Sequence, residues 1–174
     1  TKFGDDGYEI AVTFTYPEGK DNYIMFRGTD MVGNPFTSSD KFNLKIDTSP
    51  VYFGDFTPDE NDFADRKSVE CFIQILDDGS GVDPQTVEYS VAKGGGGNES
   101  FGPWKKAVNV VEGNPTQVLM ELEFEWGSDN FIRWRANDVM GTGYNVSLPY
   151  RVWVNSKPDA EISSPEAGSY YRYD

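Results

Sequence analysis

The chain has 174 residues, of which 37% are hydrophobic and 15% aromatic, enough to build a packed core. Its 29 acidic and 15 basic residues give a formal net charge of −14, so a phosphate backbone would be repelled and nucleic acid is not expected as a partner. The sequence contains no histidine, which excludes histidine-dependent triads, histidine general bases and the usual zinc sites. No apolar run is long enough for a membrane-spanning helix, so we expect no membrane insertion in this segment.

The sequence contains an internal repeat, which is preceded in both copies by a segment of alternating apolar residues. Residues 19–50 align without a gap on residues 127–158. Identical residues at both places are Gly19, Asp21, Asn22, Ile24, Arg27, Asp30, Gly33, Ser39 and Pro50, which recur as Gly127, Asp129, Asn130, Ile132, Arg135, Asp138, Gly141, Ser147 and Pro158. The apolar alternation of residues 10–16 also matches that of residues 118–124.

This repeat predicts three pieces of a modular array. Residues 1–50 are interpreted as the last three strands of one module, residues 51–158 as a complete module, and residues 159–174 as the first strand region of a following module. Three strands alone would leave sheet edges and half a core open. We therefore expect the missing strands of the first module to come from a longer polypeptide or from a neighbouring copy by strand addition.

The complete module reads as a series of short strands. Apolar and polar residues alternate with a period of two between clusters of Gly, Pro, Asn and Asp, and no useful helical periodicity occurs. The strands are predicted at residues 51–56, 68–77, 85–93, 104–111, 116–126, 130–138 and 149–155. Seven such strands predict an all-β fold of the antiparallel β-sandwich class.

The second predicted strand, SVECFIQIL, contains the single cysteine of the chain, Cys71. A lone cysteine can form neither an internal disulfide nor a thiolate metal site. Because Val69, Cys71, Ile73 and Ile75 alternate with mostly polar neighbours, we expect Cys71 to pack in the core as a small hydrophobic side chain.

The segment IRWRANDVMGTG, residues 132–143, is interpreted as a hairpin. Trp134 falls on the core face of its strand. Asp138 is suited to begin the turn by accepting hydrogen bonds from nearby backbone amides, and Gly141 is suited to a positive φ. Asp30 and Gly33 supply the same parts in the first copy.

The chain resembles the tandem Ig-like and fibronectin type III-like repeats of large archaeal and bacterial cell-surface proteins. The resemblance rests on this hairpin strand, on the following strands that close with KIDTSP or VNSKP, and on the segment DDGSGVDPQTVEYSV. The resemblance covers almost the whole chain. It implies an extracellular structural role in a stalk, surface layer or filament, with neighbouring modules or other copies of the protein as partners and no catalytic activity. Since there are no paired cysteines, a true immunoglobulin domain with an inter-sheet bridge is not expected.

The acidic loop DDGSGVD is a candidate Ca²⁺ site. It offers Asp77, Asp78 and Asp83 near one pole of the sandwich, where the linker residue Asp47 could join them. The spacing is not that of an EF-hand, and ordinary turn chemistry with solvated charge is the alternative. No other cofactor is expected. The row of Glu121, Glu123 and Glu125 is the usual pattern of a solvated outer strand face and does not indicate a catalytic pair.

Two tryptophans and two asparagines are candidates for surface roles. Trp153 is out of phase with the core residues of its strand, and an outward tryptophan can stack on a sugar or anchor a partner. Together with Trp104 it supports an alternative function as a carbohydrate-binding or adhesin module, unless a neighbouring loop covers it. Asn98 and Asn145 begin N-glycosylation sequons in predicted loops, which makes glycans candidate partners.

Overall fold

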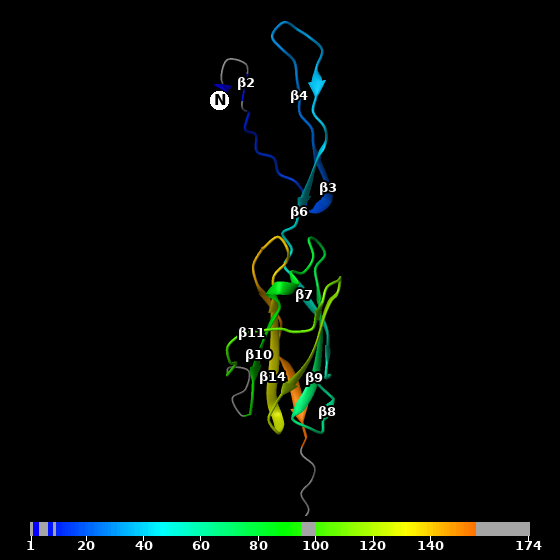
Figure 1. Ribbon diagram of the computed structural model, residues 1–174, viewed down its shortest axis with the longest axis vertical. Helices are drawn as coiled ribbons and strands as arrows, with labels where there is room; N and C mark the ends of the chain where they lie inside the picture. The colour runs from blue at the N-terminus through cyan, green and yellow to red at the C-terminus, as the bar shows by residue number, and fades with distance from the viewer. Residues whose placement is uncertain (1, 4–6, 9, 95–99, 156–174) are drawn as a thin grey trace, which may run out of the picture.

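The computed structural model describes residues 2–3, 7–8, 10–94 and 100–155. They form an elongated all-β molecule, in which a hairpin unit, residues 10–46, stands end to end with a β-sandwich, residues 52–154 (Figure 1). The described residues contain one short 3₁₀ helix, η1 (Pro84–Thr86), and no helix long and apolar enough to cross a membrane. The predicted boundary at residues 158 and 159 and the third piece lie outside the described residues.

The sandwich consists of two sheets, which confirms the predicted all-β sandwich class. One sheet has the strand order β12 (Val110–Val111), β13 (Thr116–Glu123), β9 (Ser68–Leu76) and β7 (Tyr52–Thr57). The other has the order β11 (Lys105–Lys106), β10 (Glu88–Ala92), β14 (Gly127–Ala136), β16 (Tyr150–Val154) and β8 (Phe63–Ala64), with β15 (Asn145–Val146) paired to β14. The pairings found among the described residues of the sandwich are antiparallel except that of β16 with β8.

The core lies between these sheets and is built from alternate residues of their strands. Trp134 of β14 is its largest fully buried side chain, and Cys71 of β9 is also fully buried, as the sequence predicts. Burial raises the pKa of the Cys71 thiol to about 12. The remaining members of the buried core cluster are Val51, Val69, Ile73, Ile75, Val82, Val87, Val118, Met120, Phe124, Ile132, Ala136, Val152 and Val154.

Two predicted strands differ in detail from the structure. Residues 104–111 form two short strands in different sheets, because β11 pairs with β10 whereas β12 pairs with β13. The segment crosses from one sheet to the other, and Asn109 adopts a positive φ of 55° just before β12. The predicted strand 85–93 likewise starts late, because Asp83 caps η1 before β10 begins.

The hairpin unit pairs β3 (Gly19–Ile24) with β6 (Phe42–Ile46), and β4 (Arg27–Gly28) with β5 (Thr37–Ser38). A further pair, β1 (Lys2–Phe3) with β2 (Gly7–Tyr8), precedes it. The hairpin has the same register as its second copy in the sandwich. Gly19 faces Ile46 as Gly127 faces Val154, Asn22 faces Leu44 as Asn130 faces Val152, and both ladders have a bulge between the glycine and the asparagine.

Burial differs sharply between the two copies. Phe26 is 49% exposed in the hairpin unit, whereas its equivalent, Trp134, is fully buried. Residues 10–16 repeat the alternation of β13 but form no strand, and Ile10 is 78% exposed where Val118 is fully buried. The reason is that β13 is held by β9, and no strand equivalent to β9 faces residues 10–16 among the described residues.

Candidate functional site

The junction between the hairpin unit and the sandwich is residues 47–50, a linker fixed by side-chain hydrogen bonds. Thr48 Oγ1 donates to a carboxylate oxygen of Glu18 at 3.0 Å, and Ser49 Oγ donates to the other. These hydrogen bonds, with that from Ser49 the stronger influence, hold the pKa of Glu18 below its ordinary value. The linker therefore leaves the hairpin unit in a defined direction, and Pro50 limits its freedom before β7.

Asp47 reaches from this linker into the first loop of the sandwich. Its Oδ2 accepts a hydrogen bond from the backbone N–H of Ser80 at 2.5 Å, and its Oδ1 accepts one from Ser49 at 3.2 Å. Hydrogen bonding from Ser80 lowers the pKa of Asp47. A Cβ atom at Gly79 would lie 2.2 Å from Asp47 Cγ, so the close approach of the linker to this loop requires glycine.

Asp77 follows β9 directly and is only 1% exposed. Its Oδ1 accepts hydrogen bonds from the backbone N–H groups of Gly79 at 3.0 Å and Gly81 at 2.6 Å, which shape the loop. Its Oδ2 is buried and has no hydrogen-bond partner among the described residues. A buried carboxylate oxygen without a partner is unusual and calls for a physical explanation.

Asp138 lies in the loop after β14 and is 2% exposed. Its Oδ1 accepts from the backbone N–H groups of Gly141 at 2.6 Å and Thr142 at 3.0 Å, and Thr142 Oγ1 donates to Oδ2. These amides are three and four residues on, and Gly141 takes the expected positive φ of 77°. A bridge between Val82 and Asp138 brings this loop beside the loop after β9.

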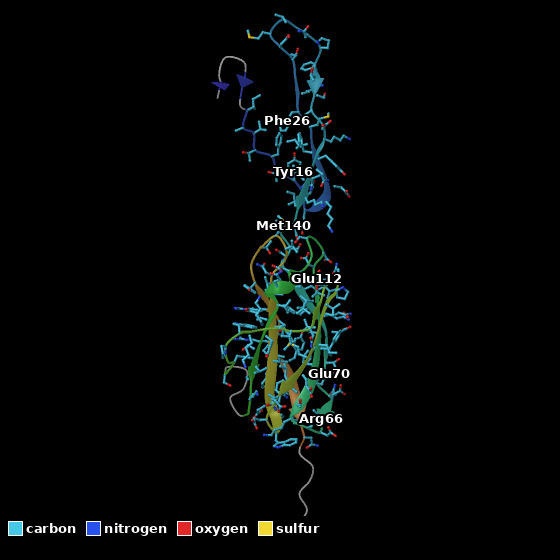
Figure 2. The ribbon with its side chains drawn as sticks, in the orientation of Figure 1. Tyr16, Phe26, Arg66, Glu70, Glu112 and Met140 are labelled. Carbon is cyan, nitrogen blue, oxygen red and sulfur yellow. The ribbon has the colours of Figure 1, made fainter. Side chains whose placement is uncertain are left out.

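Asp47, Asp77 and Asp138 together form what we call the acidic cluster. One carboxylate oxygen from each lies within 4.8 Å of the other two. A cavity of about 640 Å³ adjoins it, lined from both units, with Lys20 from the hairpin unit and Met140 from the sandwich among its residues. Met140 lies at the end of the sandwich that faces the hairpin unit (Figure 2). The arrangement supplies clustered hard oxygen atoms where two structural units meet.

The structure places the four predicted metal ligands in three different settings. Asp47 and Asp77 belong to the acidic cluster, but Asp78 accepts a hydrogen bond from the Tyr52 hydroxyl at 3.1 Å, and Asp83 Oδ1 accepts from Gln85 at the start of η1. The third member, Asp138, was not predicted as a ligand, because its place at the start of a turn explains the residue without a metal. The equivalent aspartate of the first copy, Asp30, also begins a turn, so the sequence repeat indicated a role for Asp138 in the turn and not in metal binding.

The two candidate tryptophans are half-buried and engaged within the chain. Trp104 has the guanidinium groups of Arg133 and Arg135 over its ring, at 4.7 and 4.5 Å from the ring centroid. Trp153 packs edge-on against Phe63 of β8, with ring centroids 5.0 Å apart. A neighbouring segment therefore covers Trp153, and the pair does not form two open stacking platforms.

The remaining surface candidates have local roles or lie outside the described residues. Asn145 is in β15 and not in a loop, and its Nδ2, the atom to which a glycan would be attached, donates to Val51 O at 2.7 Å. Asn98 lies outside the described residues. In the glutamate row, Glu121 accepts a hydrogen bond from Ser68, and Glu125 forms an ion pair with Lys67, as expected of an outer strand face.

Comparison with known proteins identifies no family for this chain. No protein-family model matches it, and no curated protein does. A solved structure that resembles it is described as the crystal structure of CopC from Methylosinus trichosporium OB3b, with 17% sequence identity and a TM-score of 0.42, over 64% of this chain and 99% of that chain. A likeness at this level leaves the function open.

Proposed function

We propose that this chain is a structural segment of an extracellular surface protein built from tandem β-sandwich modules. It would act in a stalk, surface layer or filament and carry no catalytic activity. The observation that supports this most is the recurrence of one hairpin, with the same register and the same bulge, at two places in the chain. Repetition of a structural unit along one chain is typical of proteins that need reach more than a single active site.

The hydrogen bonds of the two copies repeat as well as their strands. Asn22 Nδ2 donates to Pro17 O and Gly19 O, as Asn130 Nδ2 donates to Glu125 O and Gly127 O. Ser39 and Ser147 both accept from a backbone N–H on the opposite strand and donate to the next residue's carbonyl. This shared detail supports the proposal that the two copies are parts of repeated modules in an array.

The junction supports a spacing role. The linker is bound on one side through Glu18 and on the other through Asp47, so both units restrain it. The long axes of the two units run end to end (Figure 1). A spacer needs this combination of extension and restrained bending, whereas a flexible tether does not.

The proposal is tested on intact cells of the source organism with an antibody raised against this chain. We expect the antibody to label the cell surface and to detect, under native conditions, a species much larger than the 19.5 kDa of this chain. Brief protease treatment of intact cells should remove the signal, and a cytoplasmic protein serves as the control. A species no larger than this chain, protected from protease inside the cell, would overturn the proposal.

A further inference from the structure

We propose that the acidic cluster binds a Ca²⁺ ion that bridges the linker to both loops of the sandwich. Asp47 would supply ligand oxygen from the linker, Asp77 from the loop after β9, and Asp138 from the loop after β14. The ion would thus link the two units at their point of contact. The binding of Ca²⁺ does not depend on the proposed structural function. Its consequence, a junction between the two units that Ca²⁺ stiffens, rests on that function.

The first support is the unpartnered oxygen of Asp77. This carboxylate is 1% exposed, and its Oδ2 has neither solvent nor a hydrogen-bond donor within the described part of the chain. Leaving a buried acceptor unsatisfied is costly, and more so for a charged group. A bound cation is the simplest partner for it, since a carboxylate oxygen that is already dry can ligate without first being desolvated.

The second support is the balance of charge. Three carboxylates meet within 4.8 Å, and none of them forms an ion pair with a lysine or arginine in the described ranges. Like charges at this separation repel strongly where they are shielded from water. Lys20 lines the adjoining cavity but forms no ion pair with Asp47. A divalent cation would relieve the repulsion directly.

The third support is the fit of the ligand set to Ca²⁺. Two oxygens that each lie about 2.3–2.6 Å from one Ca²⁺ are at most about 4.6–5.2 Å apart, so oxygens within 4.8 Å of one another can share the ion. The ligands are carboxylates only, and the chain has no histidine, which favours Ca²⁺, Mg²⁺ or Mn²⁺ over metals that prefer nitrogen or sulfur. Mg²⁺ demands shorter, near-octahedral coordination, which a set drawn from two units is less suited to give.

The fourth support is the shape of the loop around Asp47. Gly79 leaves the space that the Asp47 carboxylate occupies, and the backbone N–H groups of Ser80 and Gly81 orient Asp47 and Asp77. The carboxylates are therefore held in place by hydrogen bonds before any ion arrives. Such preorganisation reduces the ordering cost of binding.

The test is a titration of the isotope-labelled, chelator-treated chain with CaCl₂, followed through its backbone amide resonances. We expect saturable shifts at Gly79, Gly81, Gly141 and Thr142, with a dissociation constant of about 10⁻⁴–10⁻³ M, the range of extracellular Ca²⁺ modules. A parallel titration with MgCl₂ should give weaker binding. No saturable shift at these amides up to about 10 mM CaCl₂, or tighter binding of Mg²⁺, would overturn the proposal.

Matched variants separate a site from general surface charge. Asp77→Asn and Asp138→Asn should each weaken Ca²⁺ binding by about tenfold or more, because affinity depends on the number of charged ligands. Asp78→Asn and Asp83→Asn remove the same charge close by and should change the affinity less than about twofold. If Asp77→Asn or Asp138→Asn does not fold, Asp47→Asn in the linker carries the test. Equal losses in the control variants would overturn the assignment.

The fate of the joint is measured separately. Small-angle X-ray scattering should show a narrower distribution of overall dimensions with saturating Ca²⁺ than with chelator, and Asp47→Asn should abolish the difference. If Ca²⁺ binds saturably at the acidic cluster but the distribution of overall dimensions does not narrow, the junction is not stiffened by Ca²⁺, although the Ca²⁺ site itself is confirmed. A protein shown to be cytoplasmic would overturn the proposed function and leave the binding result intact.

Discussion

Replacing Asn130 with alanine is expected to destabilise the sandwich by about 3 kcal/mol. The side chain is fully buried and makes three hydrogen bonds: its Oδ1 accepts from Glu125 N at 3.0 Å, and its Nδ2 donates to Glu125 O at 2.7 Å and Gly127 O at 3.2 Å. They tie the end of β13 to the bulge at the start of β14. Losing each of these part-buried bonds costs about 1 kcal/mol, so the three together account for the expected loss of stability.

The assay is urea unfolding followed by tryptophan fluorescence. All four tryptophans, Trp104, Trp126, Trp134 and Trp153, belong to the sandwich, so the signal does not report on the hairpin unit. The matched control is Asn22→Ala, which removes the equivalent bonds in the hairpin unit and should move the sandwich transition by less than about 0.5 kcal/mol. A loss below about 1 kcal/mol for Asn130→Ala, or equal shifts for both variants, would show that these hydrogen bonds do not stabilise the sandwich as expected.

Three further outcomes follow from individual contacts. Because burial raises the pKa of Cys71 to about 12, the thiol of the folded protein should resist a thiol reagent at pH 8 and react rapidly in urea. Rapid labelling of the folded protein would contradict this burial. The stability that the protonated thiol contributes should be lost only as the pH rises from 9.0 towards 12. Gly79→Ala should displace the linker and speed amide exchange at Ser80, so unchanged exchange there would show that the close approach is not needed. Arg135→Ala removes a partly buried ion pair with Glu88, at 2.6 Å, and should lower the free energy of unfolding by about 2 kcal/mol in the same urea assay. Arg135→Lys should recover only part of this stability, because lysine lacks the planar guanidinium group. Full recovery by lysine would show that charge alone is responsible.

Much of the fold could be predicted because period-two alternation reports directly on which face of a strand is buried. β9 and β13 match their predicted ranges closely, and Trp134 is buried as the alternation requires. The segment 104–111 could not be predicted in the same way. Its alternation is real, but the sheet to which each half belongs depends on partners that lie far away in the sequence.

Two of the three members of the candidate site could be predicted from the sequence. Asp77 stands out in DDGSGVD, and Asp47 follows from the expectation that a linker ends near that loop. Asp138 lies far beyond Asp77 in the sequence, and the loops meet through a bridge at Val82 that no local pattern encodes. Asp78 and Asp83 look equivalent to Asp77 in sequence, yet they differ in direction: one faces the Tyr52 hydroxyl and the other caps η1.

The two copies of the hairpin separate what local sequence determines from what packing adds. Asp30 accepts hydrogen bonds from Val32 and Asn34 in an exposed loop. The β3–β6 ladder has the same register as the β14–β16 ladder. It does so although no opposing sheet buries Phe26 within the described part of the chain. Turn and bulge chemistry is thus sufficient for the register of this hairpin. The opposing sheet decides burial and the order of residues 10–16, because a strand needs a hydrogen-bonded neighbour as well as the right alternation. A sequence repeat therefore predicts hairpin geometry faithfully, and predicts a core only where the facing strands are present.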